Sequence, residues 1–240
     1  MDSRERVIEI VRRFFSSEWK ELSLHDIRAI YLWGSIVRPD FDPSISDVDC
    51  VAMCGPVPPV RLIMILRDEA RSEHKELARL NVRHLLMADF NGCPPQSDLA
   101  KILDPRLLLA DFPSWIWVCG ERLSLSNFAL RPCSPSETYR LQLEALRMRM
   151  HRCLSVPRTE APRHVLKAAG YLIHTIHKVR DGEHPFSYED LESRSDPVTA
   201  QLAQIVVTLR SRDWPDDECE QAISLIVDLL NQIGGYHAAG

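Results

Sequence analysis

The sequence predicts an α+β fold in which a domain with a small mixed sheet, residues 1–125, precedes a helical bundle domain, residues 135–240. In the first half, short apolar segments typical of strands alternate with patterns typical of amphipathic helices. From residue 136 onward the pattern is helical throughout. A stretch rich in serine and proline, residues 124–136, separates the halves and is typical of a linker. With 45% hydrophobic residues, a chain of 240 residues can build the cores of two small domains.

The first half opens with an amphipathic helix to about residue 21, because apolar residues recur at helical spacing from Val7 to Phe15. This segment lacks the uninterrupted apolar core of a signal peptide. Strands are predicted where apolar runs are bounded by polar or turn-forming residues, at positions 27–33, 47–53, 82–88 and 115–119. Helices are predicted at positions 60–80 and 98–103. Elements in this order favour a sheet covered by helices.

Four further helices are predicted in the second half, at positions 136–154, 161–180, 197–211 and 215–233. Ser136 is a suitable cap for the first of them, and Pro162 and Pro215 lie near helix starts, where proline is tolerated. Four helices of this length with short connections favour an up-and-down bundle.

The strand at 27–33 ends in Leu32-Trp33-Gly34-Ser35, and a short loop then leads to Ser46-Asp47-Val48-Asp49. Residues two apart in a strand face the same side, so Asp47 and Asp49 point into one spot while Val48 points into the core. Two carboxylates so close repel each other unless a cation lies between them. The pattern therefore predicts a divalent metal site, and Mg²⁺ is the natural candidate because it prefers oxygen ligands and keeps positions for water and substrate phosphates.

The residues around this pair are suited to a nucleotide. Gly34 lets a triphosphate approach the backbone without meeting a Cβ atom. Ser35 offers a hydroxyl and a backbone N–H, and Arg38 can add a charge-assisted contact to the leaving pyrophosphate. Ser46 completes the set of candidate nucleotide-binding residues.

The two segments at 32–38 and 43–51 resemble the signature of the DNA polymerase beta-type nucleotidyltransferase superfamily. They are most similar to its small bacterial members, which include the aminoglycoside nucleotidyltransferases and the minimal nucleotidyltransferases of toxin–antitoxin pairs. The resemblance implies that Gly34 and Ser35 bind nucleotide phosphates. It also implies that Asp47 and Asp49 hold metal ions that activate an acceptor hydroxyl and stabilise the departing pyrophosphate. Pro39 stands where a glycine often occurs in the family, but this departure removes no catalytic group.

Family members often carry a third carboxylate on a later strand, which corresponds here to residues 81–89. Arg83 and His84 occupy the expected centre of that strand, and Asp89 at its end is the candidate third metal ligand. In antibiotic-modifying members the catalytic base can come from the helical domain, where Glu137 and Glu144 are candidates.

Three classes of function remain open. The first is transfer of AMP from ATP to a hydroxyl of a small molecule such as an aminoglycoside, which would make the protein an antibiotic-resistance enzyme. The net charge of −5 favours it, because an acidic cleft attracts a cationic acceptor. The second is nucleotidyl transfer to RNA or to a protein, for which basic residues gather at Arg140, Arg147, Arg149, His151, Arg152, Arg158 and Arg163. The third is a non-catalytic binding or regulatory role.

The remaining features favour a cytoplasmic enzyme. The seven cysteines have no paired short spacing and are typical of thiols in a reducing compartment. The longest apolar stretch, residues 62–66, is bounded by Arg61 and Arg67, so no membrane span is expected. Four histidines are expected to pack or to lie at the surface of helices and not to bind metal: His164, His174, His177 and His184.

Overall fold

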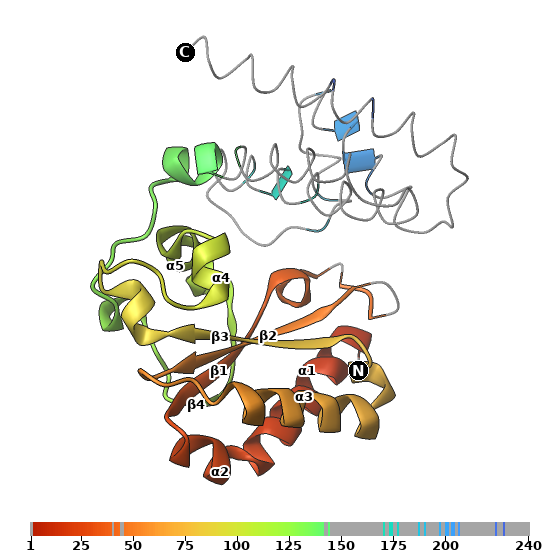
Figure 1. Cartoon of the computed structure of the whole chain (residues 1–240). Coiled ribbons are helices and arrows are strands. Elements are labelled where there is room, and N and C mark those ends of the chain that lie inside the picture. The colour runs from red at the N-terminus through yellow and green to blue at the C-terminus, as the bar shows by residue number, and fades with distance from the viewer. Residues whose placement is uncertain are drawn as a thin grey trace. The chain divides into compact units, whose positions relative to one another are not determined.

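The structure, a computed structural model, describes residues 2–39, 41–43 and 46–141, together with single positions between Glu144 and Asp228. The chain divides into two compact units, Met1–Cys133 and Ser134–Gly240 (Figure 1). The first unit contains the mixed sheet and the candidate site.

Four strands form one sheet in the order β3-β2-β1-β4. They are β1 (Ile27–Trp33), β2 (Val48–Cys54), β3 (Leu80–Leu86) and β4 (Ile116–Gly120). The central strand β1 is antiparallel to both β2 and β4, whereas β2 and β3 run parallel. The sheet is therefore mixed, which confirms the α+β class predicted for this half of the chain.

Helices cover both faces of the sheet (Figure 1). They are α1 (Ser3–Ser17), α2 (Trp19–Leu24), α3 (Val60–Glu73), α4 (Asp98–Ile102) and α5 (Pro105–Asp111). Side chains of Asp2, Ser97 and Asp104 cap α1, α4 and α5 by accepting from backbone N–H groups.

Several predicted boundaries are wrong. The N-terminal helix ends at Ser17, and a second short helix follows after Glu18. The helix predicted at 60–80 ends at Glu73, because His74 adopts an extended conformation and a 3-10 turn, η2 (Lys75–Leu77), follows. Strand β3 consequently starts at Leu80, two residues earlier than predicted. Helix α5 was not predicted, although Asp104-Pro105 is a typical helix start.

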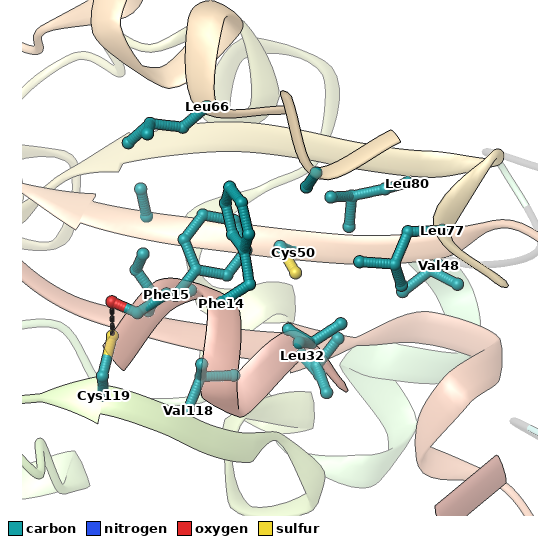
Figure 2. Packing of buried hydrophobic residues seen from close by; sticks show 14 of the residues in the cluster. Phe14, Phe15, Leu32, Val48, Cys50, Leu66, Leu77, Leu80, Val118 and Cys119 are labelled. Carbon is teal, nitrogen blue, oxygen red and sulfur yellow. Dashed lines mark hydrogen bonds between the residues drawn. The ribbon is translucent and has the colours of Figure 1, made fainter. Parts of the chain in front are cut away.

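One core lies between the sheet and helices α1 and α3. Phe15 of α1 and Leu66 of α3 pack there against Leu32 and Cys50 of the central strands (Figure 2). The Cys119 thiol donates a weak hydrogen bond to the Phe15 carbonyl oxygen at 3.7 Å. Leu32 and Cys50 occupy the alternate positions of β1 and β2 that face α1 and α3.

The opposite face carries a second core, rich in aromatic rings. Val51 and Met53 of β2 point to this side, together with Tyr31, and pack against α4, α5 and Phe112. Since residues two apart share a face, Asp49 lies on this side of β2 as well. The two cores therefore assign the Asp49 side chain to the face opposite α1 and α3.

In the second unit the first helix begins one residue earlier than predicted. Ser134 and Glu137 form a reciprocal cap, in which the Glu137 backbone N–H donates to Ser134 Oγ and the Ser134 N–H donates to Glu137 Oε2. Pro135, and not Ser136, is the first helical residue. The predictions of helices at 161–180, 197–211 and 215–233 fall almost entirely outside the described residues, so the bundle remains a prediction. Within the described part of the chain, no helix has the length and apolar character that crossing a bilayer requires.

Candidate active site

The Gly34-Ser35 segment forms a tight turn at the end of β1. Trp33 is extended, and Gly34 then takes a φ of +73°, in the left-handed region that favours glycine. The chain continues as a 3-10 turn, η1 (Gly34–Val37). Glycine is therefore needed here for the backbone conformation alone, quite apart from any ligand.

Two contacts hold this turn in place. The Ser35 hydroxyl donates to the carbonyl oxygen of Asp47 at 3.1 Å. From α1, Arg4 donates through Nε to the Ile36 carbonyl at 2.8 Å and through Nη2 to the Val37 carbonyl at 3.2 Å. These carbonyls lie at the negative end of the turn, where a guanidinium is favourable. The sequence offered no sign of this role for Arg4, since its partners lie 32 and 33 residues away.

The antiparallel register of β1 and β2 brings the predicted motif together. Trp33 pairs with Asp49, so the turn that follows Trp33 lies beside the residues that precede Asp49. Asp47 stands immediately before β2, and both carboxylates are partly exposed. Gly34, Ser35 and the aspartate pair thus meet at one end of the sheet.

The other predicted nucleotide-binding residues belong to the loop that joins η1 to β2. Arg38 is half-buried, and its backbone N–H donates to the Ser35 carbonyl at 3.1 Å. Ser46 is buried, and its N–H donates to the Asp42 carbonyl at 2.8 Å. These bonds tie the described parts of the loop to the turn and to the start of β2.

Asn81 lies beside the candidate site and was not predicted from the sequence. In the parallel pairing of β2 and β3 it lies opposite Asp49, and its Nδ2 is 3.4 Å from Asp49 Oδ1. Arg71 of α3 reaches the same amide from the other side, with Nη2 at 3.3 Å from Asn81 Oδ1. A polar residue at the start of an apolar strand was the one available signal.

Asp89 does not join this group, which corrects its prediction as a third metal ligand. The side chain is fully buried. Its Oδ2 accepts from the Leu86 N–H at 2.9 Å, and Oδ1 accepts from the Gln96 and Ser97 N–H groups at 2.6 and 3.2 Å. Burial raises the pKa of Asp89, but hydrogen bonds from Ser97, Gln96 and Leu86 outweigh it and leave the pKa below its ordinary value. Asp89 is thus an anchor for the loop between β3 and α4.

Of the two residues at the centre of β3, only Arg83 faces the same side as Asp49. It pairs with Val51, whereas His84 pairs with Ala52, which points into the core under α1 and α3. Within the part of the chain that the structure describes, no three or more histidine, cysteine, aspartate or glutamate side chains gather as a metal site. The candidate site is therefore an aspartate pair next to an amide.

The two proposed bases of the second unit have local partners. Glu137 caps its own helix through Ser134, with Oε2 accepting from the serine hydroxyl at 2.9 Å. Glu144 forms an ion pair with Arg140 at 3.2 Å. Both remain sequence-based candidates for the base.

Comparison with known proteins identifies the fold. No family model matches the chain, and no curated protein matches its sequence. Among solved structures, spectinomycin adenyltransferase AAD(9) from Enterococcus faecialis, determined with ATP and spectinomycin, is similar with a TM-score of 0.61. The similarity covers 95% of this chain and 99% of that one, at 13% sequence identity. The chain has a nucleotidyltransferase fold. This confirms, at the level of the fold, the resemblance found in the motif around Gly34 and Asp49.

Proposed function

We propose that the protein is a metal-dependent nucleotidyltransferase that moves AMP from ATP to a hydroxyl of a small molecule such as an aminoglycoside antibiotic and releases pyrophosphate. One observation carries the proposal. The Ser35 hydroxyl joins the Gly34 turn to the backbone of Asp47, next to Asp49, by a hydrogen bond. This arrangement occurs on a fold similar to that of an adenyltransferase whose structure was determined with ATP and spectinomycin.

The residues present fit a magnesium ion. Asp47 immediately precedes β2 and Asp49 is the second residue of that strand, and both are partly exposed. Carboxylate oxygens are the ligands that Mg²⁺ prefers. Two protein carboxylates leave room in the coordination sphere for water and for substrate phosphates. When bound, the ion supplies charge neutralisation of the phosphates and polarisation of the reacting phosphoryl group.

The chain's own residues have distinct tasks in this proposal. Gly34 keeps the backbone open beside the phosphates, and Ser35 turns its hydroxyl from the Asp47 carbonyl to a phosphate oxygen when nucleotide binds. Arg38, on the loop between η1 and β2, contacts the departing pyrophosphate, and Ser46 on the same loop takes part in binding the nucleotide. Asp47 and Asp49 would hold the metal ion, and they would so bring the nucleotide phosphates and the acceptor hydroxyl to one place, where the transfer becomes effectively intramolecular.

The net charge of the chain is the basis on which we propose a small-molecule acceptor. A net charge of −5 favours a cationic small molecule over a polyanionic strand. Of the basic residues that kept RNA open as an acceptor, Arg140 forms an ion pair with Glu144, and those at 147, 149, 151, 152, 158 and 163 lie outside the described residues. RNA and protein acceptors are accordingly outcomes of the test below.

The test is a transfer assay with each of the four nucleoside triphosphates labelled at the α-phosphate. The protein and Mg²⁺ are incubated with spectinomycin, with a panel of aminoglycosides, or with total RNA, and the labelled product is identified by mass. We expect label from ATP in a small molecule, and none with the Asp47→Asn variant. Label in RNA, or in the protein itself, would replace the small-molecule acceptor. Absence of label under every condition would contradict the enzymatic proposal.

A further inference from the structure

Asn81 bridges the candidate metal ligand and a helix on the other side of β3. Its Nδ2 lies 3.4 Å from Asp49 Oδ1, and its Oδ1 lies 3.3 Å from Arg71 Nη2. Arg71 is itself anchored, because its Nε donates to the Leu80 carbonyl at 2.8 Å. The three side chains form a row from α3 across β3 to β2.

The chemistry of the two neighbours fixes the orientation of the amide. A guanidinium has donors only, so the Asn81 atom that faces Arg71 must be the carbonyl oxygen. An ionised carboxylate has acceptors only, so the atom that faces Asp49 must be the NH₂ group. Both neighbours therefore require the same orientation of the amide. A flipped amide would place its NH₂ group against the Arg71 guanidinium and its oxygen against the Asp49 carboxylate.

We propose that Asn81, held by Arg71, is a positioning residue that fixes the Asp49 carboxylate for metal binding; the inference rests on the proposed function of the aspartate pair. By donating to Oδ1, Asn81 restricts rotation of the Asp49 carboxylate. Partners of metal ligands commonly orient them in this way, and their removal weakens metal binding. Because the amide is neutral, it does so without adding a third negative charge to the pair.

The register of β2 and β3 makes residue 81 the position on β3 that lies directly opposite Asp49. Asp49 and Asn81 are direct neighbours in the parallel ladder, whereas Arg83 is paired with Val51, two residues along the sheet. A carboxylate at 81 would repel Asp49 in the absence of metal and would pair with Arg71. Asparagine satisfies both neighbours at once.

The test uses the full chain and Mn²⁺ alone, titrated while the signal of free Mn²⁺ is followed by electron paramagnetic resonance. We expect one site in the wild type and in Asn81→Ala, with the dissociation constant raised about tenfold in the variant. Arg71→Gln should raise it by a smaller factor, because the Asn81 amide can then turn away. The matched control is Asp68→Asn, since Asp68 approaches Arg71 Nη1 at 3.9 Å without touching Asn81, and it should bind Mn²⁺ as the wild type does.

The dissociation constant separates positioning from simple support of the fold. If Asn81 only stabilised the fold, Asn81→Ala would bind fewer equivalents of Mn²⁺ with an unchanged dissociation constant, and the inference would be overturned. Should that variant not fold, an unchanged dissociation constant in Arg71→Gln would overturn it equally. Failure of the proposed metal site looks different: the wild type would then bind no Mn²⁺, or Asp49→Asn would bind it as tightly as the wild type.

Discussion

Replacing Asp89 with asparagine should destabilise the first unit and leave metal binding intact. The carboxylate accepts three backbone N–H groups in a fully buried position, two on Oδ1 and one on Oδ2. Asparagine keeps one carbonyl oxygen, which can serve Gln96 and Ser97, but its NH₂ group then faces the Leu86 N–H. A buried hydrogen bond to a charged group contributes about 1.5–3 kcal/mol, so losing one and leaving its donor unpaired should lower the unfolding free energy by about 2–4 kcal/mol.

The assay is urea unfolding followed by tryptophan fluorescence, since Trp33, Trp115 and Trp117 belong to the first unit. The pKa of Asp89 is lowered in the folded protein, since its hydrogen bonds outweigh the upward effect of burial. Its stabilising contribution is therefore full above the unfolded pKa of about 3.9 and is lost as the pH falls through the lower folded value. The difference between wild type and Asp89→Asn should be full at about pH 7 and shrink below about pH 4. Equal stability at neutral pH, or weakened Mn²⁺ binding in the variant, would refute the anchoring role.

Three further predictions concern other residues. Gly34→Val should weaken binding of a non-hydrolysable ATP analogue by orders of magnitude, because a β-branched residue is strained at a φ of +73°. Ser35→Ala should weaken the same binding about tenfold to a hundredfold. Titration calorimetry measures both affinities. Gly120→Ala should lower the melting temperature more than Gly92→Ala. Both glycines have positive φ, but a Cβ at 120 would overlap the Trp19 ring and the Arg28 carbonyl, whereas at 92 its nearest neighbour is 3.8 Å away. Burial raises the pKa of Cys54 and Cys119 to about 12, so alkylation near neutral pH, mapped by mass spectrometry, should label exposed Cys93 well before either.

Each of these predictions has an outcome that contradicts it. Unchanged nucleotide affinity in Gly34→Val would remove the turn from the nucleotide site. Equal melting temperatures of the two alanine variants would mean that Trp19 moves aside without loss. Labelling of Cys119 as fast as Cys93 would show that the core under α1 opens readily.

The local sequence was sufficient to predict the strands and the motif residues, but not the contacts that these residues make with other strands and helices. Apolar runs and turn residues predict all four strands, and the alternation of β2 predicts that Asp47 and Asp49 share a side. The register of β3 depends on where α3 ends and how η2 returns the chain, so the contact between Asn81 and Asp49 was not predictable. Arg4 likewise contacts η1 only once α1 has packed on the sheet.

The error at Asp89 has a different physical cause. A carboxylate at the end of a strand near a predicted site is compatible with metal binding, but the sequence does not reveal that the following loop turns its N–H groups toward it. Burial and backbone donors, and not distance along the chain, decide the role of such a residue.

The bond that is broken in ATP tests most directly whether the aspartate pair serves nucleotidyl transfer. ATP labelled at the α-phosphate and ATP labelled at the γ-phosphate are each incubated with the protein, Mg²⁺ and the acceptor panel. We expect the α-label in the acceptor and the γ-label in pyrophosphate, in equal amounts. The Asp49→Asn variant should form neither product. It should melt at or above the wild-type temperature, because removing one negative charge relieves the repulsion between the two carboxylates. Transfer of the γ-label to the acceptor, or near-normal turnover by folded Asp49→Asn, would contradict it.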